Sequence, residues 1–221
     1  ETDGYRDHSA ARKDQFNSKL GVKLNEESML TFVVNYINQP DNQDPLGLTA
    51  QQVRENPRQA APDSTTGAIP GVSLADRYDT GRDLSNVQAG AVYELAISDM
   101  DILRFLAYVG QRSNTGYLAV GTNSVTTSGG VSELDRKFYG VGARWTRKMD
   151  VAARPVTLSA GIDYDYATDA RKGYVNNNGV ATFRKRDEEN IAFSSGVYIQ
   201  TELQFTPAWS ASAGLRYTRI D

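Results

Sequence analysis

Arginine and tyrosine side chains that could hold a ligand occur together in or beside three segments without regular periodicity. Arginine makes charge-assisted hydrogen bonds to anionic oxygens, and tyrosine adds an aromatic face and a hydroxyl group. Taken singly, each of these residues is better explained as a solvated loop residue, and only their grouping favours ligand capture. The candidate binding residues are Arg77, Tyr78, Arg112, Tyr117, Arg171, Tyr174 and Arg184.

Other site chemistry has little support in the sequence. There is no cysteine, and the single histidine, His8, has Asp7 and Ser9 as chain neighbours, which cannot form a catalytic triad with it. Asp163 and Asp165 share one strand face and could form a carboxylate pair or metal site, but the plainer interpretation is a polar wall. We therefore expect no enzymatic activity, no metal site and no cofactor.

Composition sets further limits on the class of protein. The 221 residues carry a formal net charge of −3, so the basic footprint of a nucleic-acid-binding protein is absent and no nucleic-acid partner is expected. No apolar run reaches about 18 residues, so no membrane-spanning helix is expected. The chain start, beginning at Glu1, has no signal-peptide pattern and reads as mid-chain sequence.

Period-two alternation is the dominant pattern and predicts β-strands. In residues 156–166 the even positions are all apolar or aromatic, whereas the odd positions are small or polar. Because successive side chains of a strand point to opposite faces, one face is apolar and the other polar. Similar alternation predicts eight strands, at residues 16–24, 29–38, 87–97, 102–112, 139–147, 156–166, 191–205 and 209–219.

Short and long connections alternate between these strands. Short turns are expected at 25–28, 98–101, 148–155 and 206–208, and long loops at 39–86, 113–132 and 168–189. Strands of about 10 residues with short turns on one rim and long loops on the other are typical of a transmembrane β-barrel. The predicted fold class is therefore all-β, an antiparallel up-and-down transmembrane barrel.

The apolar face is predicted to touch lipid, and the polar face to line an interior. Aromatic residues lie at both ends of the apolar faces, as expected for rings at the two membrane interfaces. A soluble sandwich or lipocalin-like cup is the alternative, and it would bury the apolar faces instead. The aromatic residues are Trp145, Phe205 and Trp209 beside short turns, and Tyr36, Tyr164, Tyr166 and Tyr217 toward the long loops.

Several short stretches, in order along the chain, resemble TonB-dependent outer-membrane receptors of the ferric-siderophore class. No single stretch is strongly diagnostic, and the likeness rests on their order and spacing. They are DGYRDHS at 3–9, QP at 39–40, QDPLGLT at 43–49, NPRQ at 56–59, YGV at 139–141, RWT at 144–146, GIDYD at 161–165, RKGY at 171–174 and RDEEN at 186–190.

This resemblance implies a bacterial outer-membrane receptor that binds a ferric siderophore or other iron chelate and imports it with energy delivered through TonB. Family members have a plug domain and a 22-stranded barrel. Residues 1–221 match only part of the barrel, so the plug domain is expected to be absent and TonB to act only through it. The chain is expected to be a slice of the larger barrel in contact with outer-membrane lipid. The alternative is a small self-contained barrel with a structural or anchoring role.

The longest connection, residues 40–86, is expected to be a mobile extracellular loop that helps to close over the ligand. It carries five prolines, which break regular structure, and four arginines against seven acidic residues. Long loops on a rigid barrel are where binding usually resides. The sequence does not distinguish one iron chelate from another.

Overall fold

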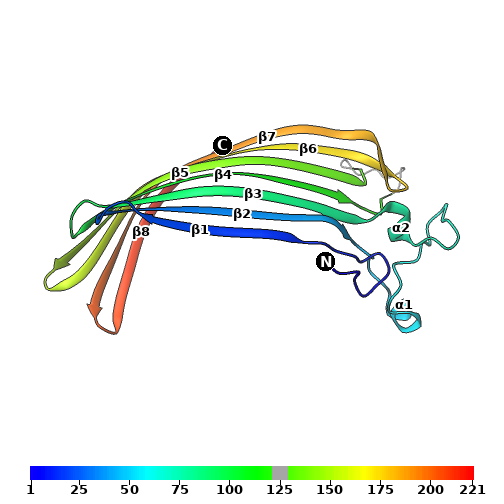
Figure 1. Cartoon of the computed structure of the whole chain (residues 1–221), viewed down its shortest axis with the longest axis horizontal. Coiled ribbons are helices and arrows are strands. Elements are labelled where there is room, and N and C mark those ends of the chain that lie inside the picture. The colour runs from blue at the N-terminus through cyan, green and yellow to red at the C-terminus, as the bar shows by residue number, and fades with distance from the viewer. Residues whose placement is uncertain (121–128) are drawn as a thin grey trace.

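One antiparallel sheet of eight strands forms most of the molecule in the computed structural model, which describes residues 1–120 and 129–221 (Figure 1). The strands lie side by side in chain order, which confirms the predicted all-β, up-and-down arrangement. The strands are β1 (Asp14–Lys23), β2 (Ser28–Gln43), β3 (Gly81–Ala96), β4 (Asp101–Tyr117), β5 (Val131–Val151), β6 (Arg154–Asn177), β7 (Val180–Thr206) and β8 (Trp209–Ile220).

Short turns join the strand pairs at one rim, as the sequence predicts. The turn between β5 and β6 is shorter than expected, because only Ala152 and Ala153 separate the two strands. Both residues have positive φ, 51° and 59°, which is typical of the two-residue turns that match strand twist. At the opposite rim two short helices, α1 (Ala50–Glu55) and α2 (Leu74–Tyr78), lie in the connection between β2 and β3 (Figure 1).

The apolar face of the sheet is uncovered. Phe105, Val141 and Ile162, in the middle of β4, β5 and β6, are 44%, 52% and 58% exposed. Among the described residues the buried apolar side chains are few, and none lies in the middle of a strand: they are Ala60, Ala61, Ala75, Tyr78 and Val131. A soluble sandwich or cup would bury this face, so the arrangement matches a sheet whose apolar side meets lipid. No helix in the described part is long and apolar enough to cross a membrane.

The sheet is open at both sides. In the described chain β1 pairs only with β2, and β8 pairs only with β7. A self-contained eight-stranded barrel would require β1 and β8 to pair with each other. The curved, open sheet therefore has the form of part of a wider barrel (Figure 1).

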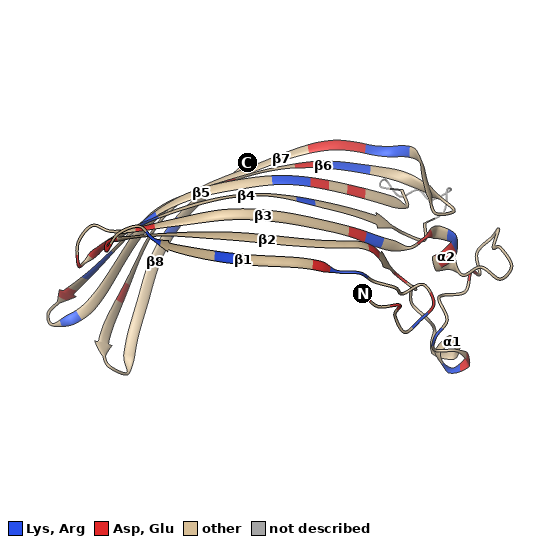
Figure 2. Cartoon of the chain, in the orientation of Figure 1, with Lys and Arg blue, Asp and Glu red and all other residues tan. Residues whose placement is uncertain are grey.

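Aromatic residues mark both limits of the apolar band. Tyr139 stacks on Tyr166 with ring centroids 5.2 Å apart and lies 6.5 Å from the ring of Tyr164. We call these three residues the tyrosine belt. At the short-turn rim, the indole Nε1 of Trp145 donates to Asp101 Oδ1 at 2.9 Å. Charged residues gather toward the two rims, with a largely uncharged stretch between them (Figure 2).

Three strands extend well beyond the predicted lengths. β5, β6 and β7 contain 21, 24 and 27 residues, and β6 and β7 continue to a turn at Asn178 and Gly179. The prediction of a long loop at 168–189 is therefore wrong. Past the tyrosine belt both faces of these strands meet water, so the apolar–polar alternation ends while the backbone ladder continues.

Candidate functional site

The strand extensions beyond the tyrosine belt present two different faces. Residues that pair directly across strands share a face, so the register of β3 to β7 sorts every side chain. We call the face opposite the lipid-facing residues the inner wall, and the other the outer face. The charged residues of the inner wall are Arg82, Arg112, Arg136, Arg171 and Arg186, with Asp169 and Glu188.

The outer face of the same segments has the reverse balance. Its charged residues are Asp83, Glu133, Asp135, Asp187 and Glu189, with Lys137, Lys172 and Arg184. The inner wall thus carries five cations against two anions, and the outer face three cations against five anions. An anion entering the barrel region meets a positive wall that the overall charge of −3 conceals.

Arg112 and Arg136 stand directly opposite each other on β4 and β5. Like charges in such a position repel, unless a counter-charge lies between them. Arg136 has one, because its Nε and Nη2 both donate to the carboxylate of Asp169 at 2.6 Å. These hydrogen bonds raise the pKa of Arg136 and lower the pKa of Asp169. Arg112 has no ion-pair or hydrogen-bond partner among the described residues, so its charge is available to a ligand.

Two other arginines of the inner wall, Arg171 and Arg186, lie near the same carboxylate, that of Glu188. Arg186 pairs with Glu188, and this hydrogen bond lowers the pKa of the Glu188 carboxyl. The buried Nε of Arg186 has no hydrogen-bond partner in the part of the chain that the structure describes. Arg171 lies across from Glu188 in the ladder, and its charge contributes to lowering the pKa values of Glu188 and Asp169. The wall therefore holds more guanidinium donors than carboxylate acceptors.

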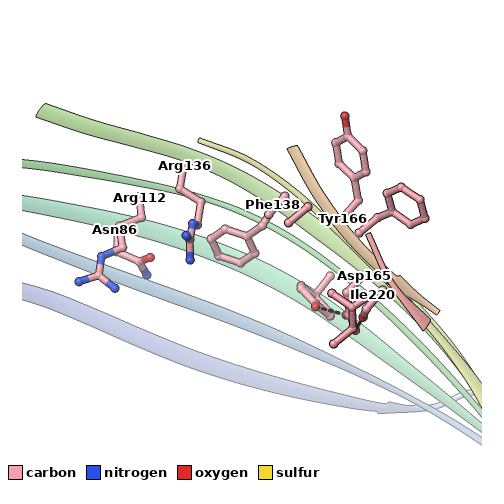
Figure 3. Close-up of a pocket in the computed structure, with 12 residues that line it drawn as sticks. Asn86, Arg112, Arg136, Phe138, Asp165, Tyr166 and Ile220 are labelled. Atoms are coloured by element: carbon pink, nitrogen blue, oxygen red, sulfur yellow. Dashed lines mark hydrogen bonds between the residues drawn. The ribbon is translucent and has the colours of Figure 1, made fainter. Parts of the chain in front are cut away.

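A cavity of about 430 Å³ opens at Arg112 and Arg136 on the inner wall. Figure 3 shows Arg136 and Phe138 pointing to one side of the sheet and Tyr166 to the other. The Phe138 ring lies over Gly110, where a Cβ atom would come within 2.3 Å of the ring. Glycine at position 110 thus permits an aromatic surface beside the two guanidinium groups.

A hydrogen-bonded group closes the membrane side of this cavity. The hydroxyl of Tyr108 donates to Asp165 Oδ1, and Ser194 Oγ donates to Asp165 Oδ2 at 3.3 Å. The carboxylate of Asp165 is therefore occupied by two donors and is not a free acid or base. No group of three or more metal-binding side chains occurs among residues 1–120 and 129–221.

Five of the predicted binding residues lie on strands, and four of them, Tyr117, Arg171, Tyr174 and Arg184, were expected in loops. Arg112 and Arg171 belong to the inner wall. The other three, Tyr117, Tyr174 and Arg184, lie on the opposite face, where the register aligns them with Val131. The structure thus brings together only two of the seven candidates and adds Arg82, Arg136 and Arg186, which the sequence analysis missed.

The three candidates on the opposite face interact with neighbouring side chains outside the inner cavity. The hydroxyl of Tyr174 donates to Glu133 at 3.3 Å, and Arg184 Nη1 lies 2.6 Å from Asp187. Burial, together with the nearby carboxylates of Asp83, Asp79 and Glu133, raises the pKa of Tyr117. None of the three points into the inner cavity.

Arg77 and Tyr78, the other two candidates, hold the β2–β3 connection together. Arg77 Nη1 donates to Asp63 Oδ2 at 2.7 Å, and Arg77 Nε donates to Asn178 Oδ1 at 3.0 Å. Hydrogen bonds from Thr65 and then Arg77 lower the pKa of Asp63, whose side chain is buried. Tyr78 is itself buried, so both residues stabilise the connection instead of facing solvent.

The β2–β3 connection is a packed unit fastened to the start of the chain. Arg6 donates to three backbone carbonyls, those of Pro45, Leu46 and Gln59, at 3.1, 2.6 and 2.9 Å. His8 Nε2 lies 2.8 Å from the carbonyl oxygen of Thr80. These contacts place the connection beside residues 1–13 and give it a fixed attachment.

Asn176, at the end of β6, ties the outer loops to one another. Its side-chain amide is fully buried and donates to the carbonyls of Tyr78 and Leu118 at 2.8 and 3.1 Å. Its Oδ1 accepts from the backbone N–H of Gly179 at 2.9 Å. A single side chain thus joins the β2–β3 connection, the end of β4 and the β6–β7 hairpin.

An open, curved sheet with an exposed apolar band, an aromatic belt and long loops at one rim defines the outer-membrane β-barrel class. Residues 15–221 match the family model for the TonB dependent receptor-like β-barrel. The chain therefore belongs to the TonB-dependent receptor β-barrel family.

Solved structures with the same fold include two transporters and an import receptor. The unliganded ferric citrate transporter FecA has a TM-score of 0.74 and 15% identity, over 97% of this chain and 30% of that one. The ferric-catecholate import receptor Fiu from E. coli K12, in its open form, has a TM-score of 0.63 and 13% identity, over 98% of this chain and 38% of that one. The RagAB peptide transporter has a TM-score of 0.52 and 11% identity, over 95% of this chain and 28% of that one. The chain thus spans about a third of the length of the first two relatives.

Proposed function

We propose that the protein containing this chain is a bacterial outer-membrane receptor that takes up an anionic iron chelate. In this proposal residues 1–221 supply part of the barrel, and TonB delivers energy through a plug domain elsewhere in the receptor. The observation that carries the proposal is the inner wall, where five arginines face two carboxylates. Ferric citrate and ferric catecholates are the substrates named for two structural relatives, and iron chelates of both kinds can present anionic oxygens.

Arg112 is the residue that we expect to contribute most to binding. Its guanidinium has no partner in the described chain, so a bound anion would gain charge-assisted hydrogen bonds without breaking an existing ion pair. Arg136 and Phe138 border the same cavity and would supply a second charge and an aromatic surface.

The first experiment measures chelate binding by the full-length receptor carrying Arg112→Gln. Losing one charge-assisted hydrogen bond of about 1.5–3 kcal/mol should weaken binding at least tenfold. Radiolabelled ferric citrate and a ferric catecholate are supplied separately, and Lys172→Gln on the outer face is the matched control. Unchanged affinity of Arg112→Gln for every chelate that the intact receptor binds would refute the role of the inner wall.

We also propose that residues 40–86 help to enclose the ligand. The structure allows a cleaner deletion than the whole segment, because its two ends belong to β2 and β3. The Asp44 N–H donates to the Thr80 carbonyl at 2.8 Å, so residues 45–79 can be replaced by a short Gly-Ser linker.

The deletion variant is expected to lose uptake and chelate binding under iron limitation, with each chelate supplied alone. Unfolding of the barrel in urea serves as the control for folding. If uptake and binding are unchanged for every chelate that the intact receptor uses, the segment is only a connector.

A further inference from the structure

A second hollow lies on the lipid-facing side of the sheet, behind the inner wall. It measures about 510 Å³ and runs along β3, β4, β5 and β6, directly beside the tyrosine belt. The small side chain of Ala89 lies between exposed Val87 and Val109, which leaves a depression in the apolar surface. The rings of Tyr139 and Tyr166 form its other side. This hollow plays no part in the proposed chelate site, because it faces the opposite side of the strands.

Three polar side chains stand in one row at the end of this hollow. Gln111, Lys137 and Thr168 are direct neighbours on β4, β5 and β6, and they follow immediately after the last apolar row. Lys137 is exposed and has no ion-pair or hydrogen-bond partner among the described residues. Lysine, glutamine and threonine together offer an ammonium group and two neutral donors at the boundary of the apolar band.

The position of this row determines what kind of partner it fits. The partner needs an apolar part that fills the hollow inside the membrane. It also needs anionic oxygens that reach Lys137, at the membrane surface. The acidic residues of the outer face begin one step further along β5, at Asp135, whose register neighbour is Ala170. A membrane lipid with an acyl chain and a phosphate headgroup has this arrangement of apolar and charged parts.

We propose that the hollow binds an anionic membrane lipid, with an acyl chain against Val87, Ala89, Val109 and the tyrosine belt. The headgroup phosphate accepts hydrogen bonds from Lys137, Gln111 and Thr168. Tyr139 and Tyr166 hold the chain at the depth where aromatic rings prefer to lie. The lipid packs against the back of the strands that form the inner wall.

The test uses native mass spectrometry of the full-length receptor in mild detergent, with phosphatidylglycerol, phosphatidylcholine or glycerol phosphate added. Phosphatidylglycerol should remain bound in preference to phosphatidylcholine. Lys137→Gln should weaken its retention about fivefold, the effect of one basic residue near an anionic surface. Lys172→Gln, on the same face but flanked in register by Glu133 and Asp187, should leave retention unchanged.

A second variant tests the acyl chain. Ala89→Phe fills the hollow and should reduce retention of phosphatidylglycerol while Lys137 stays in place. Equal retention of the two lipids by the unmodified receptor, or no effect of Lys137→Gln, would overturn the proposal. Glycerol phosphate that binds as tightly as phosphatidylglycerol would also overturn it, because the site would then hold phosphate without lipid.

Discussion

The two faces of the strand extensions share one backbone and have net charges of opposite sign. On the inner wall the basic residues are all arginine, whereas on the outer face two of the three are lysine and the third, Arg184, is paired with Asp187. Arginine presents a planar fork that binds carboxylates and similar anions in pairs of hydrogen bonds, and lysine is a compact, strongly hydrated charge. The comparison indicates that the inner wall is suited to holding an anion, whereas the outer face is suited to a hydrated surface.

The same contrast between faces continues inside the membrane, where it is expected to have its largest effect. Phe105 and Leu106 are adjacent on β4, with Phe105 on the lipid-facing side and Leu106 on the inner side. Phe105→Lys should destabilise the full-length receptor by about 3 kcal/mol, because a lysine then faces the centre of the bilayer. Urea unfolding in lipid vesicles measures the change.

Leu106→Lys is the matched control, since the inner side can hydrate the charge. Leu106→Lys should lower the free energy of unfolding by less than half as much as Phe105→Lys does. Equal costs for the two variants would mean that we have assigned the lipid-facing side wrongly.

A substitution of intermediate effect examines the aromatic part of the inner wall. Gly110→Ala would place a Cβ atom 2.3 Å from Phe138 Cζ, so the ring must move away from the arginines. Overpacking of this kind costs about 1–3 kcal/mol, and we also expect weaker chelate binding. Gly116→Ala is the control, because no atom lies within 4 Å of its new Cβ. Equal stability and binding for the two variants would show that the Phe138 ring has no fixed place in the wall.

The smallest expected effect concerns the ion pair of Arg136 and Asp169. The pKa of Asp169 is lowered in the folded protein, so the pair stabilises fully above the unfolded pKa of about 4. That contribution is lost as the pH falls through the lower folded value. Because Arg136 is 46% exposed, we expect only about 0.5 kcal/mol.

Urea unfolding at pH 6 and at pH 2.5 measures the contribution of this ion pair to the free energy of unfolding. The unmodified receptor should lose more stability on acidification than Asp169→Asn does. Asp135→Asn, on the outer face and without an ion pair in the described chain, is the control and should behave like the unmodified protein. An identical acid response of Asp169→Asn and the unmodified receptor would contradict the assignment.

The sequence predicted the membrane-spanning part of the fold well, because a lipid-facing strand must alternate strictly between apolar and polar residues. It did not predict the strand extensions, since beyond the membrane both faces are polar and the alternation disappears. Arg136 was missed for this reason, although it lies an even number of residues from the inner-facing Arg144 on the same strand. Extending the parity of β5 past Tyr139 would have placed Arg136 on the inner wall.

The roles of Arg77 and Tyr78 depend on contacts that no local pattern reveals. Arg77 pairs with Asp63, which is 14 residues away, and with Asn178, which is 101 residues away. An arginine beside a tyrosine in an aperiodic segment has the same local sequence whether it binds a ligand or secures a loop. Only the packing of the β6–β7 hairpin against the β2–β3 connection distinguishes these two roles.

The length of β7 determines how far the sheet reaches beyond the membrane. The strand has 27 residues, and a tilted strand needs only about 10 to cross a bilayer. Residues 180–192 lie beyond Phe193, which is paired with Tyr166 of the tyrosine belt, and at about 3.3 Å per residue they extend roughly 40 Å along the strand. A dissolved molecule therefore meets the tip of the β6–β7 hairpin well before it reaches the membrane surface. The hairpin turn at Asn178 is consequently within reach of large particles, such as antibodies, that cannot approach the bilayer itself.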